Sequence, residues 1–146
     1  MEQKMRMMQN IRCISKFYER EIGLAAQKVN LSRLEAAILL FLYHNPSRDL
    51  ASDIVECRQL SKANVSQGVD ALIRKGLLSR NADEEDRRCV HLHITLAGKA
   101  LLPGLLETQN AFVTALTADF SPEERVMFGE MCDRIACNAK KNLEER

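Results

Sequence analysis

The spacing of hydrophobic residues changes in one segment of this chain, and the change restricts the folds open to it. Over the first half, apolar side chains recur every three or four positions, which is the period of an amphipathic α-helix. After Gly76 they alternate, with Val90, Leu92 and Ile94 on one face of a predicted β-strand. From Leu96 the helical spacing returns. The pattern predicts a mainly α (α+β) fold with one β-hairpin.

Four helices are expected before the hairpin, and local signals mark their ends. They cover residues 1–28, 32–45, 50–57 and 61–75. The second begins at Ser32, which forms an S-x-x-E capping box with Glu35. Ser61 is a suitable N-cap for the fourth, and Gly76 follows its C-terminus, where glycine is favoured. A pair of short helices therefore comes directly before the hairpin.

The hairpin has a long, charged tip, and two helices follow it. The expected elements are strands at 77–80 and 89–95, a turn at 81–88, and helices at 96–116 and from 121 onward. Pro103 is expected to kink the first of these helices. Ser121, Pro122 and Glu124 make a complete start for the second, with a cap, a first-turn proline and an acid three residues after the cap.

The first helix carries an apolar stripe along its length. Its members follow the helical period and are Met5, Met8, Ile11, Ile14, Tyr18 and Ile22. We expect this stripe to pack on the rest of the protein or on a second copy of the chain.

Composition excludes several classes of protein. The chain has 146 residues, about one domain, with 46% hydrophobic residues and a formal net charge of +1. It is therefore neither disordered nor basic throughout, as a protein that coats nucleic acid would be. The longest apolar run, Ala36–Tyr43, is far shorter than the roughly 18 residues of a membrane-spanning helix. Near-neutrality still permits a locally basic surface.

Cysteine usage and the N-terminal segment favour a cytoplasmic protein with reduced thiols. The five cysteines are an odd count without the compact spacing of a disulfide framework. The first six residues carry charges where a signal peptide needs an apolar stretch. Secretion with disulfides is the alternative.

Two short helices followed by a β-hairpin are the parts of a winged helix-turn-helix, which places its second helix in the DNA major groove. Amide side chains on that helix can hydrogen-bond to base edges, while hydroxyl and cationic groups can reach phosphates. The outward face of the predicted helix offers such groups at Ser61, Lys62, Asn64, Ser66, Gln67 and Arg74. Residues 58–80 contain five basic residues and one acid, a net charge of +4, so this segment is locally basic.

The tip of the hairpin combines four acids with two arginines. Arg87 and Arg88 follow the acids directly, and an arginine at a wing tip can enter the narrow minor groove, where negative potential is strongest. Asp86 can orient either arginine through a charge-assisted hydrogen bond. The other three acids, at 83–85, would repel phosphate, so we expect them to point away from DNA.

The order and spacing of these motifs resemble the MarR family of bacterial winged-helix transcriptional regulators. The family pattern D-x-R, a strand and then L-T-x-x-G is matched by Asp86–Arg88, the strand and Ile94–Gly98. Leu60–Ser66 resembles the start of the family's recognition helix, and Leu72–Leu78 resembles its end. The flanking helices follow in the same order, so the resemblance covers nearly the whole chain.

The resemblance implies a homodimer that binds double-stranded DNA at a pseudo-palindromic operator, commonly as a ligand-responsive repressor. Residues 1–30 and 99–146 would be dimerisation helices and residues 31–98 the DNA-binding core of one MarR-type domain. Two recognition helices could then meet half-sites roughly 34 Å apart. The effector implied is a small aromatic or phenolic molecule, and no membrane partner is implied.

Family members often bind effectors between the DNA-binding lobe and the dimer helices, and others respond to thiol oxidation. The resemblance makes five residues candidates for an effector pocket: Phe17, Arg20, Phe41, Tyr43 and His44. Cys13 lies where peroxide-sensing members carry a reactive cysteine, but the second helix lacks the tyrosines of that subgroup near its start. Cys57 is a weaker redox candidate.

Two other features favour a structural interpretation. Cys89, His91 and His93 share one strand face, but residues two apart on a strand diverge from a tetrahedral arrangement, so an exposed wing face is expected and no metal site. Gly68 lies inside a helix, at a cost of about 1 kcal/mol relative to alanine. A tolerant position is favoured there over close approach to a DNA backbone.

Two other classes of function have weaker support. A winged-helix module that binds protein instead of DNA would account for the acidic wing tip. No phosphate loop, paired-carboxylate site, G-x-S-x-G motif or metal signature is present, so neither enzyme activity nor a cofactor is expected.

Overall fold

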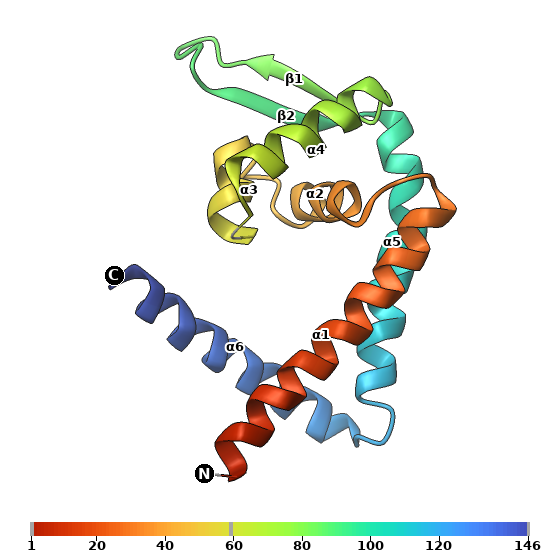
Figure 1. Cartoon of the computed structure of the whole chain (residues 1–146), viewed down its shortest axis with the longest axis vertical. Coiled ribbons are helices and arrows are strands. Elements are labelled where there is room, and N and C mark those ends of the chain that lie inside the picture. Colours follow the sequence, from red (N-terminus) through yellow and green to blue (C-terminus); the bar gives the residue numbers. More distant parts are fainter. Residues whose placement is uncertain (1, 59, 146) are drawn as a thin grey trace. The chain divides into compact units, whose positions relative to one another are not determined.

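The computed structural model describes residues 2–58 and 60–145, and the chain divides into two compact units, Met1–Phe112 and Val113–Arg146. In chain order the elements are α1 (Glu2–Lys28), α2 (Arg33–His44), α3 (Ala51–Arg58), α4 (Lys62–Arg74), β1 (Leu78–Ala82), β2 (Val90–Ile94), α5 (Leu96–Leu116) and α6 (Pro122–Glu144) (Figure 1). The mainly helical winged-helix prediction is confirmed, because α3, α4 and the β1–β2 hairpin follow one another as expected.

Side-chain caps begin three of the helices where the sequence predicts them. Ser32 Oγ accepts a hydrogen bond from the backbone N–H of Glu35, and Glu35 Oε1 accepts one from that of Ser32. Ser121 and Glu124 make the same reciprocal pair at α6. Ser61 Oγ accepts from the N–H of Asn64 at the start of α4. Each cap satisfies helix N–H groups that have no intrahelical partner.

The hairpin pairs β1 and β2 antiparallel, from Leu78 opposite Ile94 to Ala82 opposite Val90. The first strand runs two residues further than predicted, so the connecting tip is shorter than the 81–88 turn expected from charge alone. A third segment pairs with the outer edge of β2, since the N–H of Leu92 donates to the carbonyl of Asp49 at 2.8 Å. The wing is thereby attached to the loop before α3.

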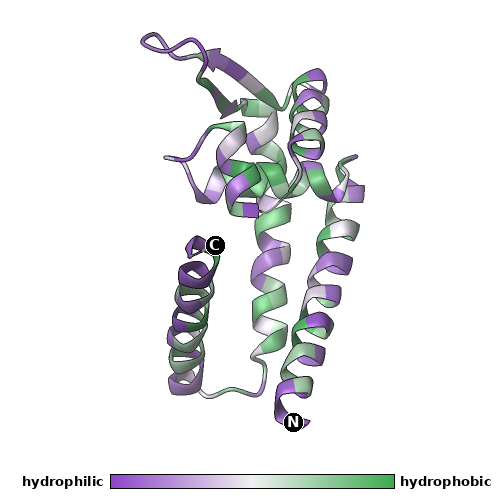
Figure 2. Ribbon diagram, turned by 60° about the vertical axis from the view of Figure 1, so that its left-hand side comes forward, coloured by the Kyte–Doolittle hydropathy of each residue, from purple (hydrophilic) through white to green (hydrophobic). Residues whose placement is uncertain are grey.

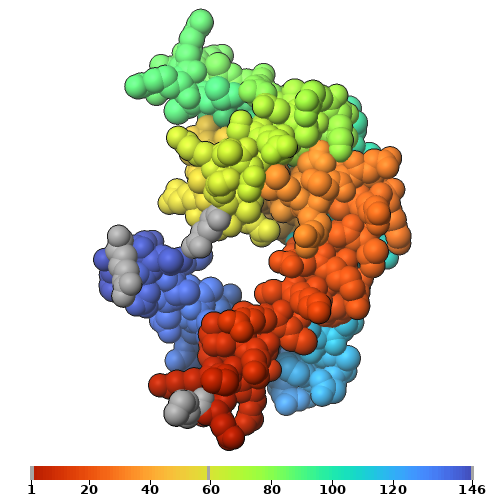
Figure 3. All heavy atoms as spheres, viewed as in Figure 1, coloured from red at the N-terminus to blue at the C-terminus, as the bar shows by residue number. Residues whose placement is uncertain are grey.

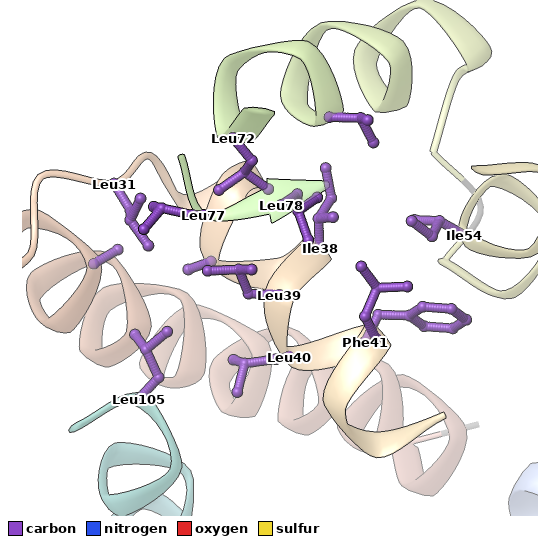
Figure 4. Packing of buried hydrophobic residues seen from close by; sticks show 14 of the residues in the cluster. Leu31, Ile38, Leu39, Leu40, Phe41, Ile54, Leu72, Leu77, Leu78 and Leu105 are labelled. Carbon is purple, nitrogen blue, oxygen red and sulfur yellow. The ribbon is translucent and has the colours of Figure 1, made fainter. Parts of the chain in front are cut away.

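Helix α2 lies at the centre of the first unit and is buried on most sides, as its nearly continuous apolar sequence predicts. Ile38 and Leu39 are fully buried. Around them lie Leu72 of α4, Leu78 of β1 and Leu105 of α5 (Figure 4). The core therefore joins α2 to the recognition helix, the hairpin and α5.

Gly68 corrects both interpretations made from the sequence. It is buried on the face of α4 that packs on α2, where an added Cβ would lie 2.5 Å from Cδ1 of Ile38 and 3.2 Å from Cγ of Leu34. The position is therefore neither tolerant nor directed at DNA. Its missing side chain lets two helices approach closely.

Helix α5 begins at the base of the hairpin and continues through Pro103. The hydroxyl of Thr95 donates to the carbonyl of Gly76 at 2.7 Å and accepts from the N–H of Gly98 at 3.1 Å. Gly98 packs against backbone, because a Cβ there would lie 2.3 Å from the carbonyl oxygen of Leu77. This contact holds the first turn of α5 against the backbone of Leu77, just before β1.

The second unit contains the end of α5 and all of α6. Phe120 and Phe128 pack edge to face, with ring centroids 5.7 Å apart. None of the described residues of α6 is buried, and six large apolar side chains on it are exposed: Val126, Met127, Phe128, Met131, Ile135 and Leu143. Within the part of the chain that the structure describes, no helix is both long and apolar enough to cross a lipid bilayer.

Gly98→Ala is expected to destabilise the fold by about 2 kcal/mol, because the new methyl group would overlap the Leu77 carbonyl and the backbone cannot easily move away. Gly104→Ala in the same helix is the matched control. Nothing lies within 4 Å of a Cβ at that position, so the change should be neutral or stabilise by up to about 1 kcal/mol. Chemical denaturation followed by circular dichroism measures both, and equal stability of the two variants would contradict this account.

Candidate DNA-binding site

Helix α4 separates its apolar and polar residues onto opposite faces. Val65, Val69 and Leu72 are buried against the core. The side chains predicted to contact DNA all lie on exposed positions: Ser61, Lys62, Asn64, Ser66, Gln67 and Arg74. The structure therefore brings these residues together on one accessible helix, with α3 before it and the hairpin after it (Figure 1).

The N-terminus of α4 adds backbone donors to this face. Ser61 Oγ caps only one of the first N–H groups, that of Asn64. Helix N-termini favour anions because their first N–H groups lack intrahelical partners and carry the positive end of the helix dipole. Lys62 is exposed beside these donors, so this end of α4 is suited to a phosphate group.

The local positive charge is smaller than the sequence count suggests. Arg80 donates to Asp70 at 2.7 Å, and Lys75 forms an ion pair with Glu35 from another helix. Three basic residues of the segment are exposed and have no ion pair within residues 2–58 and 60–145: Arg58, Lys62 and Arg74. These three carry the positive charge that the helix pair presents.

At the hairpin tip, Asp86 holds Arg88 in place. Asp86 Oδ1 accepts from the backbone N–H and from Nε of Arg88, both at 3.1 Å. Hydrogen bonds from the Arg88 side chain and backbone hold the pKa of Asp86 below its ordinary value. The Arg88 side chain is nevertheless 92% exposed, and Arg87 is also exposed. The pair is therefore oriented and still accessible; its contact with DNA stays a prediction.

The hairpin protrudes from the first unit, and its tip is hydrophilic (Figures 2 and 3). Within the tip, the N–H of Asp83 donates to the carbonyl of Cys89 at 2.8 Å, and the N–H of Cys89 to that of Asp86 at 2.9 Å. Glu84 and Glu85 are exposed, whereas Asp83 is half-buried. Two acids are therefore exposed on the same projection as the two arginines.

His91 is not on a free face of the wing, which corrects the expectation of an exposed Cys-His-His surface. Its Nδ1 donates to Oδ1 of Asp49 at 2.8 Å, and its Nε2 lies 3.9 Å from Oδ2 of Asp83. The hydrogen bond to Asp49 raises the pKa of His91, and nearby negative charge adds to the effect. His93 is exposed. Among the described residues, no three His, Cys, Asp or Glu side chains are grouped as a metal site requires.

The five candidates for an effector pocket do not line one common cavity. Tyr43 lines a cavity of about 650 Å³ together with residues of β2 and α5, including His93 and Lys99. Phe41 is buried in the core instead. His44 contributes to a different contact, a hydrogen bond of 2.9 Å to Gln109 of α5.

Phe17 and Arg20 belong to an aromatic cluster between α1 and α5. The ring of Phe17 lies 5.3 Å from that of Phe112, and the guanidinium of Arg20 lies 5.5 Å from the centre of the Phe17 ring. The amide of Gln109 donates to the hydroxyl of Tyr18 in the same region, at 2.8 Å. Cys13 and Cys57 are exposed thiols on α1 and α3.

Three contacts at this site have partners too far apart in the chain for sequence reasoning to pair them. They are Arg80 with Asp70, His91 with Asp49, and Lys75 with Glu35. The first pair joins α4 to the next strand along the chain and spans only ten positions. The other two pairs span 42 and 40 positions and become visible only in three dimensions.

Comparison with known proteins agrees with this geometry. A model of the MarR family matches residues 29–88. The HTH-type transcriptional regulator MhqR of Bacillus subtilis is 33% identical over 114 residues, which cover 78% of each chain. The HTH-type transcriptional repressor YetL of the same organism is 29% identical over 111 residues, covering 73% of this chain and 66% of that protein.

The fold is also that of a DNA-bound structure. A Listeria monocytogenes protein assigned to the MarR family of transcriptional regulators, crystallised with a 26-mer DNA, superposes with a TM-score of 0.84 at 15% identity. The match covers 92% of this chain and 89% of that one. The helix pair, the exposed α4 face and the hairpin define a winged helix-turn-helix transcriptional regulator. Within that class, the chain belongs to the MarR family.

Asp49→Asn is expected to lower the pKa of His91 toward the ordinary histidine value of about 6.5, because the carboxylate that stabilises the imidazolium is removed. Since the folded-state pKa is raised, the stabilising contribution is complete below about pH 6.5 and is lost as pH rises through the folded value. A histidine NMR titration measures the pKa. Asp83→Asn, at the longer distance, is the control and should lower the pKa less.

Proposed function

We propose that the protein is a sequence-specific DNA-binding repressor that acts as a homodimer on a pseudo-palindromic operator. The observation that carries the proposal is the exposed polar face of α4, whose opposite face is locked into the core. A helix held in this way can enter a major groove without unfolding any part of the domain.

The groups on α4 divide into base readers and phosphate binders. The amides of Asn64 and Gln67 can donate to and accept from base edges, as adenine recognition requires. Four other exposed residues can bind phosphate oxygens: Ser61, Lys62, Ser66 and Arg74. Phosphate contacts position the protein, and base contacts provide its specificity.

In the same proposal the wing contacts the minor groove beside the recognition helix. Arg88, oriented by Asp86, is the inserted side chain, and Arg87 contacts the flanking phosphates. The hydrogen bond between β2 and the loop before α3 supports this role, because it fixes the position of the wing relative to the helix pair. Glu84 and Glu85 project on the side away from DNA.

Dimerisation is assigned to residues 1–30 and 99–146, with residues 31–98 as the DNA-binding core. The support is exposed apolar surface: Met5, Met8, Ile11 and Ile14 on α1, and the six exposed apolar side chains of α6. The α1 residues, and Met127, Met131 and Ile135 of α6, recur every three or four positions and form stripes that a second copy could cover. The described chain does not bury these stripes within its own units.

Regulation by a small aromatic or phenolic effector is the finer part of the proposal. The cavity next to Tyr43 supports it, because apolar side chains line most of it and His93 and Lys99 offer polar groups for an acidic or phenolic oxygen. Phe17 and Arg20 do not line this cavity; they remain candidates as part of the separate aromatic cluster of α1 and α5. Oxidation of Cys13 is the alternative signal, supported by its exposure.

Arg88→Ala is expected to weaken binding to the DNA upstream of the protein's own gene, without unfolding the protein. Loss of one charged contact per protomer should also lower the slope of log affinity against log salt by about 0.9 per protomer. Fluorescence anisotropy over a salt series measures both quantities. The control is Lys16→Ala on α1, which removes the same charge outside α3, α4 and the hairpin.

Two results would contradict the proposal in different ways. Unchanged affinity of Arg88→Ala would remove the wing role alone. Wild-type binding no tighter than to random DNA at about 0.15 M salt would remove specific DNA recognition altogether, since specific binding normally exceeds non-specific binding by at least about a thousandfold.

Ile11→Glu is expected to dissociate the homodimer, because it would place an unpaired carboxylate in an apolar interface. A cost of about 3 kcal/mol or more raises the dimer dissociation constant at least about a hundredfold. Sedimentation velocity over a concentration series measures this. Gln27→Glu adds the same charge at the exposed end of α1 and should leave the dimer intact; dissociation of both variants, or of neither, would argue against the assigned interface.

A protein-binding winged helix is the second candidate, favoured by the exposed Glu84 and Glu85 at the wing tip. The two functions differ in their response to these acids. Glu84→Gln/Glu85→Gln should preserve or strengthen DNA binding in a regulator and should abolish partner binding in an interaction module.

A further inference from the structure

A partly buried ion pair joins the C-terminus of α4 to the start of α2. Nζ of Lys75, the C-cap residue of α4, lies 2.9 Å from Oε2 of Glu35 and donates to its Oε1 at 3.1 Å. The same ammonium donates to the backbone carbonyl of Asn30 at 2.8 Å. One side chain therefore connects the end of α4 to α2 and to the corner between α1 and α2.

The charge of the buried Glu35 carboxylate is compensated by this contact with Lys75. The Glu35 side chain is only 8% exposed, and Oε1 also accepts the N–H of Ser32 in the capping box. Oε2 has the ion pair with Lys75 and no other hydrogen-bond partner among the described residues. Burial raises the pKa of Glu35, but hydrogen bonds from Ser32 and Lys75 outweigh burial and lower it. The carboxylate is thus ionised at neutral pH and requires its cation.

The second acceptor of Lys75, the carbonyl of Asn30, lies in a backbone segment of fixed conformation. Asn30 has a φ of 59°, in the left-handed region that residues with a Cβ seldom adopt. The N–H of the following Leu31 donates to the carbonyl of Ala26 at 2.9 Å, and the Leu31 side chain is buried. The carbonyl that Lys75 binds therefore belongs to a well-defined corner at the end of α1.

A second contact holds α4 against α2, two helical turns before Lys75. Gly68 packs directly on Ile38 of α2, and seven residues separate it from Lys75, about 10 Å along a helix. Together with the buried Val65, Val69 and Leu72, two contacts at this separation fix both the position and the direction of the α4 axis relative to α2. Close packing acts at the first and electrostatic attraction at the second.

We propose that Lys75 is a positioning residue of the DNA-binding site. Through Glu35 and the Asn30 carbonyl it sets the angle at which α4 is presented to DNA, and it does not itself contact phosphate. The proposal rests on the DNA-binding function proposed above. In a homodimer an error in this angle would be repeated at both half-sites, so specific binding should be more sensitive to it than non-specific binding.

The test compares Lys75→Met with Lys62→Met at a temperature where circular dichroism shows both variants fully folded. For Lys75→Met we expect operator affinity to fall about tenfold, the value of roughly one well-aligned base contact, with non-specific affinity and the salt slope unchanged. For Lys62→Met both affinities should fall and the slope should decrease by about 0.9 per protomer. Lys75→Arg, which keeps the cation, should restore most of the discrimination.

Amide hydrogen exchange of the DNA-free protein supplies an independent readout. In Lys75→Met the last turn of α4 should exchange faster than in the wild type or in Lys62→Met. If Lys75→Met is unstable, Glu35→Gln/Lys75→Met leaves no uncompensated charge and replaces it in both experiments.

Several outcomes would overturn the proposal. A reduced salt slope in Lys75→Met would identify a phosphate contact, and unchanged operator affinity in the folded variant would exclude a positioning role. If the wild type does not distinguish operator from random DNA, the proposed function fails, and the exchange experiment alone then decides whether Lys75 holds α4. Equal exchange rates in that last turn would reject the connection itself.

Discussion

Burial of α2 on nearly all sides is the constraint on which the rest of the first unit depends. Most of its apolar residues are buried, because α1, α4, α5 and the base of the hairpin all cover it. Close approach is possible because Gly68 carries no side chain toward Ile38. Gly98 plays a similar role where α5 passes the Leu77 carbonyl. The recognition helix is thus part of the core and its outer face is left for other contacts.

The electrostatics of the candidate site follow from this packing. Within the basic segment, Lys75 is directed back to Glu35 and Arg80 to Asp70, while Lys62 on the outer face of α4 is exposed and forms no ion pair with any described residue. The +4 segment therefore serves two purposes, since some cations hold the frame and others face solvent. A near-neutral protein can present a positive surface in this way, because only the free cations act on a partner.

Sequence reasoning succeeded where the determining interactions are local. The capping pairs of Ser32 and Ser121 act over three residues, and the hydrogen bond between Asp86 and Arg88 spans two. Periodicity located the buried face of α4 for the same reason, because a helix places every third or fourth residue on one side. It failed at Gly68, whose role depends on the side chain of Ile38 on another helix.

The sequence by itself determined the order of elements, the helix starts and the polar face of α4, since these depend on neighbours a few positions away. Tertiary structure alone decided which charged groups are free. His91 reaches Asp49 across 42 positions, and Lys75 reaches Glu35 across 40. Such pairs form only when the core brings distant segments together, and no local pattern encodes the partner. Hydrophobic burial of α2 is the physical reason that these distant charges meet.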